Sequence, residues 1–170
     1  MARETVQITG LDDVLRRLKE LGPAASARGG PVRAAVRKSA MVIVKEANKN
    51  IARIVAEPNK SGDNKSMGPM AKSMKPFRMK AKRGGQKGET FTIRAPASAR
   101  YPDSKRNPGG DAIQKIANIL EYGGTHNGVR RDAHPWMRPA FHAKRDEAVR
   151  VMTDELLKGI AKLEKKLAAK

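Results

Sequence analysis

The sequence predicts an α+β fold in which long helices pack on a small, mostly antiparallel sheet, with a long basic loop or hairpin. Two long stretches with apolar residues at helical spacing, 31–56 and 139–170, supply the helices. Short segments of alternating polarity, at residues 5–9 and 89–95, supply the strands. These two periodicities in one chain predict helices packed against a sheet.

The length of 170 residues fits a single domain, 1–170, with the basic loop or hairpin inserted at about 58–106. Hydrophobic residues, many of them Ala, make up 39% of the chain, which is low for a domain of this size. We therefore expect a small core, with partner subunits covering part of the apolar surface.

The first third of the chain predicts a strand followed by two helices. Residues 5–9 alternate in polarity, as a short strand does. Apolar residues recur at helical spacing over 11–21 until Gly22-Pro23 stops the helix. A second helix runs over 31–56 and closes at Glu57-Pro58. At 1.5 Å per residue it would be ~39 Å long, and we expect it to form the spine of the fold.

The middle of the chain changes composition sharply. Residues 59–88 are rich in Lys, Gly, Ser and Met, with few acids and little periodicity. Residues 73–79 and 89–95 predict the two strands of a hairpin whose basic tip is 80–87. A segment of this length between ordered elements is usually functional or disordered.

A third helix and a loop follow the basic segment. Residues 101–110 predict a Pro/Gly/Asn loop. Asp111 is placed to cap a helix that ends near Tyr122. Gly123-Gly124 stops this helix, and we expect a polar loop to continue through Arg131.

A final helix is predicted from about Pro139 to Lys170, since proline suits a first helical turn. His134 and Arg138 each precede a proline and are therefore expected to be extended or turn-like. The apolar face of this helix carries Phe141, Ala148, Met152, Leu156, Ile160, Leu163 and Leu167.

The charge of the chain favours acidic partners. Thirty-six Lys and Arg against 17 Asp and Glu give a net charge of +19. Such an excess attracts nucleic acid, acidic protein surfaces and anionic membranes. The chain has no cysteine, no apolar run long enough to span a membrane and no apolar N-terminal stretch of the signal-peptide type. We expect a soluble protein made inside the cell, with no membrane partner.

The sequence predicts no enzyme, no cofactor and no metal site. His126, His134 and His142 are evenly spaced but have no Cys or acidic partner at metal-ligand spacing, so we interpret them as loop and capping residues. No nucleophile elbow, phosphate loop or His-Glu-x-x-His motif occurs. The scattered acids are interpreted as helix caps or solvated charges: Asp111, Glu121, Asp132, Asp146 and Glu147.

The segment from Leu120 to Phe141, LEYGGTHNGVRRDAHPWMRPAF, is the most distinctive part of the chain. It gathers one Trp, one Tyr, one Phe and two of the three His, with the third, His142, directly after it, although aromatic residues make up only 4% of the composition. The segment has two halves: Leu-Glu-Tyr-Gly with a nearby Thr, and His-Pro-Trp-Met-Arg-Pro-Ala-Phe before a long helix. In this order the two halves resemble the tail-completion, or head–tail joining (neck), family of long-tailed bacteriophages. Gly124 departs from the family pattern, which more often runs from Gly directly to Thr.

The resemblance implies a structural virion protein at the phage head–tail junction. Such a protein completes the tail and joins it to the head connector by assembling as a homo-oligomeric ring, with six or twelve copies. Its partners would be itself, the head connector or stopper, and the tail terminator or tail tube proteins, with genomic DNA in the channel as a further candidate. It would reside in the virion, and in the host cytoplasm during viral assembly.

Two sets of residues are candidate contacts. Trp136 and Arg138 either anchor an interface or belong to the core, and Phe141 is favoured as a core anchor. The basic tract is either a solvated loop or a surface that meets DNA or an acidic partner. The subunit or partner interface set is Glu121, Tyr122, Gly123, Thr125, His134, Trp136, Met137 and Arg138. The DNA-channel or acidic-partner set is Lys72, Lys75, Arg78, Lys80, Lys82, Arg83 and Lys87.

A second hypothesis comes from the charge alone. A basic nucleic-acid-binding protein of the nucleoid- or ribosome-associated type explains the net charge of +19. It does not explain the two halves of the Leu120–Phe141 segment. It predicts tight, steeply salt-dependent binding by the isolated chain, whereas the neck hypothesis predicts weak, sequence-blind binding at most.

Overall fold

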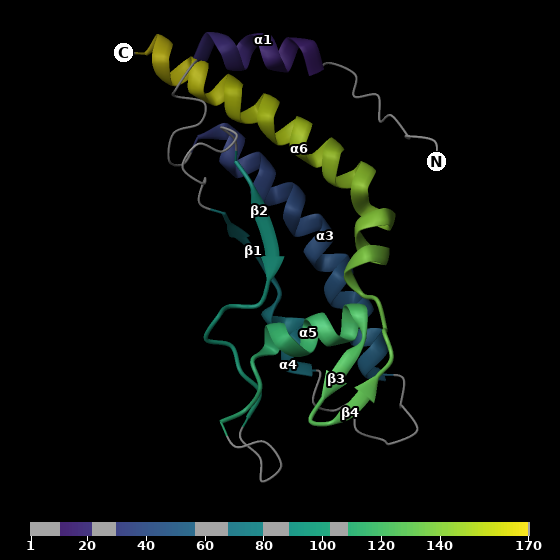
Figure 1. The fold of residues 1–170 in the computed structure, drawn as a ribbon. Helices are drawn as coiled ribbons and strands as arrows, with labels where there is room; N and C mark the ends of the chain where they lie inside the picture. Colours follow the sequence, from purple (N-terminus) through teal and green to yellow (C-terminus); the bar gives the residue numbers. More distant parts are fainter. Residues whose placement is uncertain (1–10, 22–29, 57–67, 80–88, 103–108, 170) are drawn as a thin grey trace. The chain divides into compact units, whose positions relative to one another are not determined.

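The structure, a computed structural model, describes residues 11–21, 30–56, 68–79, 89–102 and 109–169. It confirms the α+β class with long helices (Figure 1). In chain order the elements are α1 (Leu11–Leu21), α3 (Pro31–Ala56), α4 (Gly68–Ser73), β1 (Lys75–Arg78), β2 (Phe91–Arg94), α5 (Ile113–Tyr122), β3 (Gly124–His126), β4 (Val129–Arg131) and α6 (Met137–Ala168).

The strands form two two-stranded sheets. β1 pairs with β2, inside the two segments predicted as a hairpin. β3 pairs antiparallel with β4, with Gly124 opposite Arg131 and Thr125 opposite Arg130. The expected polar loop through Arg131 is therefore wrong, because this part of the chain is a hairpin. Its turn residues Asn127 and Gly128 both have positive φ, 50° and 77°, as a type I′ turn requires.

Helix boundaries follow the sequence closely. α1 and α3 begin and end where the apolar spacing and the Gly-Pro and Glu-Pro stops predict. α6 begins at Met137, two residues before Pro139. The short helix α4 has no counterpart among the predicted elements. The predicted strand at 5–9 and the hairpin tip at 80–87 lie outside the described residues.

The chain divides into two compact units made of interleaved segments. Unit 1 comprises Met1–Ala40, Arg78–Phe91 and Arg145–Lys170, and unit 2 comprises Met41–Phe77 and Thr92–Lys144. The candidate interface residues all belong to unit 2.

In unit 1 the start of α3 lies close against the later part of α6. A Cβ atom added to Gly159 would come within 2.6 Å of the Cβ of Pro31, so only glycine allows this approach. The neighbouring Ile160 is fully buried. Arg17 of α1 pairs with Glu164 of α6 at 3.9 Å, an exposed contact that contributes little stability.

Unit 2 contains the main hydrophobic core. Residues from α3, α4, α5 and the start of α6 bury their side chains together around the indole of Trp136. Apart from Trp136, the core members are small or medium in size, as the low hydrophobic content predicts. They are Ala47, Ile51, Met70, Met74, Ala95, Ile113, Ala117, Leu120, Trp136 and Ala140.

Candidate interaction site

The two halves of the Leu120–Phe141 segment are joined by the carboxylate of Glu121, which is 3% exposed. Its Oε2 accepts hydrogen bonds from the backbone N–H groups of Trp136 and Met137, both at 2.8 Å. Its Oε1 accepts the N–H of Arg138 at 3.2 Å. The first N–H groups of a helix have no partner within the helix. Glu121, at the end of α5, therefore caps the start of α6.

The side chain of Arg138 strengthens this connection. Its Nε donates to Glu121 Oε1 at 2.9 Å and its Nη2 donates to the backbone carbonyl of Glu121 at 3.1 Å. Arg138 is helical, so the expectation that it would be extended before Pro139 is wrong. A proline in the first helical turn removes no helical hydrogen bond, and the contacts of Arg138 with Glu121 outweigh the local preference.

The environment keeps Glu121 ionised. Burial acts to raise the pKa of Glu121, but hydrogen bonds from Met137, Trp136 and Arg138 outweigh burial and hold the pKa below its ordinary value of 4.5. A carboxylate at a helix start is also favoured by the helix dipole. Of the two interpretations of Glu121, a helix cap or a solvated charge, the contacts agree with the cap, and the capped helix is α6.

Trp136 belongs to the core. It is 4% exposed. Its indole Nε1 donates to the carbonyl of Ala117 at 3.1 Å, and its own carbonyl accepts Nδ2 of Asn50 at 3.0 Å. The sequence left open whether Trp136 anchors an interface or belongs to the core, and its indole belongs to the core. Met137, next to it, is partly buried against the same core.

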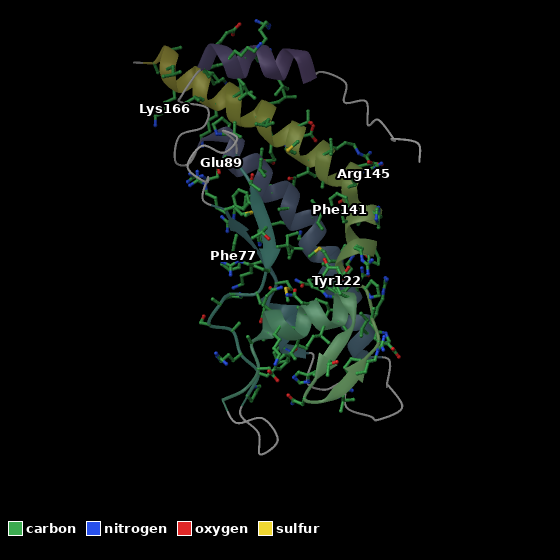
Figure 2. The ribbon with its side chains drawn as sticks, viewed as in Figure 1. Phe77, Glu89, Tyr122, Phe141, Arg145 and Lys166 are labelled. Carbon is green, nitrogen blue, oxygen red and sulfur yellow. The ribbon has the colours of Figure 1, made fainter. Side chains whose placement is uncertain are left out.

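The neighbouring aromatic residues lie on the surface. Tyr122 is 71% exposed and Phe141 is 46% exposed, and Figure 2 labels both. The expected core role of Phe141 is therefore wrong. On α6, Ala140 takes the buried position and the next residue, Phe141, points outward.

The β3–β4 hairpin and the end of α5 enclose a surface cavity of about 420 Å³. Gly123 has φ 74° and ψ 177°, and a Cβ there would meet the carbonyl oxygen of Arg131 at 3.2 Å. The backbone N–H of His134 donates to the carbonyl of Leu120 at 2.7 Å, and the His134 side chain is exposed. The cavity is lined by Tyr122, Gly123, Gly124, Thr125, Arg130, Arg131, Asp132 and Ala133.

Asp111 does not cap α5. The N-cap position is Ala112, which makes no side-chain capping bond. The Asp111 carboxylate instead contacts Lys115 Nζ at 3.0 Å and His126 Nε2 at 2.7 Å. The hydrogen bond from Lys115, followed by that from His126, holds the pKa of Asp111 below its ordinary value. Asp111 thus links α5 to β3, a role that spacing in the sequence does not reveal.

The basic candidates separate into different environments. Lys72 and Lys75 are exposed and form no ion pair with another described residue. Arg78 is engaged by Glu89, donating to both carboxylate oxygens at 2.6 and 2.7 Å. Arg33 approaches the same carboxylate at 3.6 Å. Four further candidates lie outside the described residues: Lys80, Lys82, Arg83 and Lys87.

Over the described ranges, His, Cys, Asp and Glu do not gather in groups of three that could hold a metal ion. No helix within those ranges is both long and apolar enough to cross a lipid bilayer.

Comparison with known proteins adds no relative. No family model, no curated protein and no solved structure matches the chain.

Proposed function

We propose that the protein is a structural virion protein at the head–tail junction of a long-tailed bacteriophage, where a ring of copies completes the tail and joins it to the head connector. One observation supports this most directly. The two sequence halves that resemble the tail-completion family form one connected structure, because Glu121 of the first half caps and ion-pairs the second at Arg138.

The roles within the predicted interface set differ. Glu121 and Trp136 are buried and position their neighbours. Tyr122, Thr125, His134 and Arg138 are exposed and are the side chains available to a partner. A heterologous interface between copies closes into a ring when its rotation divides a full turn. The protein would then act by binding and shape.

Antibody-gold labelling of phage particles made by the parent genome tests the location. Gold confined to the head–tail junction is the expected result. Particles without label, with the protein recovered on cellular nucleic acid, would reject the proposal.

A matched pair of phage mutants tests the interface. Tyr122→Ser removes an exposed aromatic of the predicted interface, and Leu167→Ser removes an exposed apolar residue far from it in sequence. We expect free heads and free tails to accumulate with Tyr122→Ser and normal particles with Leu167→Ser. Normal particles from both mutants would contradict the role of Tyr122.

The net charge of +19 and the exposed Lys72 and Lys75, which form no ion pair within the described ranges, support the second candidate, a basic nucleic-acid-binding protein. In that case each phosphate contact adds about 0.9 to the slope of log K against log salt. The double variant Lys72→Gln/Lys75→Gln would lower the slope by about 2, whereas Arg78→Gln, already paired with Glu89, would change it less. If nucleic-acid binding is weak and both variants have the same salt slope, the neck protein is favoured.

A further inference from the structure

Exposed aromatic and cationic side chains form a continuous strip on unit 2. The Arg138 guanidinium lies over the Tyr122 ring, 5.6 Å from its centroid. Phe141 follows Arg138 by one helical turn on α6, so the two are neighbours on the helix surface. The Phe141 ring meets the His142 ring edge-on, with centroids 5.9 Å apart. We call Tyr122, Arg138, Phe141 and His142 the aromatic strip.

Two members of the strip, Tyr122 and Arg138, are held in place before any partner binds. The Arg138 side chain is 57% exposed, yet its Nε and Nη2 are fixed by Glu121. Tyr122 is the last residue of α5 and is contacted by that guanidinium. Side chains that are already ordered lose little conformational entropy on binding. Aromatic residues and Arg are also the types that dominate protein interface energetics.

The cavity beside the hairpin continues this surface, because Tyr122 lines both. Arg130 and Arg131 contribute two exposed cations that form no ion pair with another described residue. Asp132 is the one acid among the residues that line this cavity. The cavity and the strip together therefore present three arginines against one exposed carboxylate.

We infer that the aromatic strip and the cavity dock an acidic segment of a different protein, in which carboxylates alternate with apolar side chains. Arginine pairs with carboxylates through two parallel hydrogen bonds, while exposed Tyr and Phe favour apolar contact. Charge complementarity at this surface, with three arginines and one exposed carboxylate, favours an acidic segment over another basic surface. This partner would be another protein of the head–tail junction, which rests on the proposed function.

A protein segment fits this surface better than a nucleic acid. Asp132 lines the cavity and repels a phosphate backbone, whereas a peptide N–H can donate to it. One face of the Tyr122 ring is already covered by Arg138, which leaves less of it for base stacking.

The test uses nuclear magnetic resonance of the full ¹⁵N-labelled chain. The probe is the blocked peptide acetyl-Glu-Leu-Glu-Phe-Glu-Leu-amide, and the same peptide with Gln for Glu is the neutral control. We expect the acidic peptide to shift the amide signals of Gly123, Gly124 and Thr125 and the Nε–H signal of Arg138. An absence of shifts there, or shifts confined to other basic residues, overturns the inference.

Charge-matched variants separate this site from general attraction. Arg130→Glu/Arg131→Glu and Lys45→Glu/Arg150→Glu both lower the net charge from +19 to +15, since each of the two reversals removes two charges. Lys45 and Arg150 are exposed and lie outside the cavity. We expect the Arg130/Arg131 variant to bind the acidic peptide at least tenfold more weakly than the wild type, and the Lys45/Arg150 variant less than threefold more weakly. Equal weakening overturns the inference.

Two further outcomes decide between occupants. If an oligothymidylate shifts the same amides and displaces the peptide, the surface binds nucleic acid. If raising the concentration of the chain alone shifts them, the occupant is a second copy. Peptide binding without gold label at the phage neck would reject the neck function alone, and neck label without peptide binding would reject the acidic partner alone.

Discussion

Glu121 and Arg138 are bound to each other by three hydrogen bonds, two to the carboxylate oxygen Oε1 and one to the backbone carbonyl of Glu121. The same carboxylate holds the N–H groups of Trp136 and Met137. One buried side chain therefore sets where the chain turns from the hairpin into α6. Its contribution can be measured by removing its charge alone.

Glu121→Gln keeps the side-chain shape but replaces one carboxylate oxygen with an NH₂ group, which faces the N–H donors of the α6 start or of Arg138. We expect a loss of about 2–4 kcal/mol in the free energy of unfolding, because buried N–H groups and the arginine lose their acceptor. Urea unfolding measures it. The control is Glu20→Gln, an exposed pair with Arg16 one turn away on α1, which should cost about 0.5 kcal/mol or less. Equal costs would show that the Glu121 network adds nothing special.

Stability should fall at acid pH through named carboxyl groups. The pKa values of Glu89, Asp111 and Glu121 are depressed in the folded protein. For Glu89 the main cause is its hydrogen bond with Arg78. A carboxyl group whose pKa is lower in the folded than in the unfolded protein contributes its full stabilisation at a pH above the unfolded pKa. This stabilisation is lost as the pH falls through the folded pKa.

We therefore expect the free energy of unfolding to be flat with respect to these groups from about pH 7 to about pH 5.5, and to decrease below the ordinary glutamate value of 4.5. Urea unfolding across this range measures the slope. Glu121→Gln and Glu89→Gln should each show a shallower decrease than the wild type. If the free energy of unfolding falls with pH equally in the variants and the wild type, other groups cause the loss of stability at acid pH.

Two glycines with similar φ test the tight turn after α5. Gly123→Ala combines a backbone region open almost only to glycine with a Cβ 3.2 Å from the Arg131 carbonyl oxygen, and should cost about 2–3 kcal/mol. Gly128→Ala has φ 77° and nothing within 4 Å of the added Cβ, so about 1 kcal/mol is expected. Thermal unfolding followed by circular dichroism compares them. A larger effect at Gly128 would contradict the close approach at Gly123.

Substitution should cost more stability at Trp136 than at Phe141. Trp136→Phe removes buried volume and the hydrogen bond to Ala117, and should cost about 1–3 kcal/mol. Phe141→Ser changes a half-exposed side chain and should cost about 0.5–1 kcal/mol. Far-ultraviolet circular dichroism in urea measures both. The reverse order would place Phe141 in the core.

Helices α1 and α3 could be predicted because local signals fix them. Apolar spacing sets their interiors and Gly22-Pro23 and Glu57-Pro58 set their ends. The β3–β4 hairpin was missed although Asn127-Gly128 is a strong type I′ turn signal, because its strands are three residues long and mostly polar. Short exposed strands lack the alternation that reveals longer ones.

The site was predictable in part. The sequence placed the segment from Leu120 to Phe141 at the centre of the candidate site. It could not reveal that Glu121 reaches the backbone of Trp136, because that contact depends on how α5 and α6 pack. Whether Trp136 and Phe141 are buried depends on which face of the packed chain meets the core, and apolar spacing alone placed Phe141 on that face.

The aromatic residues have an optical consequence. The single Trp and both Tyr of the chain, at positions 136, 101 and 122, all belong to unit 2. Tryptophan and tyrosine fluorescence therefore originates in unit 2 alone, whereas the far-ultraviolet signal of α3 and α6 comes from residues of both units. The protein thus carries a natural reporter for one half of itself. Agreement between the two signals during unfolding would show that the halves melt as one cooperative body.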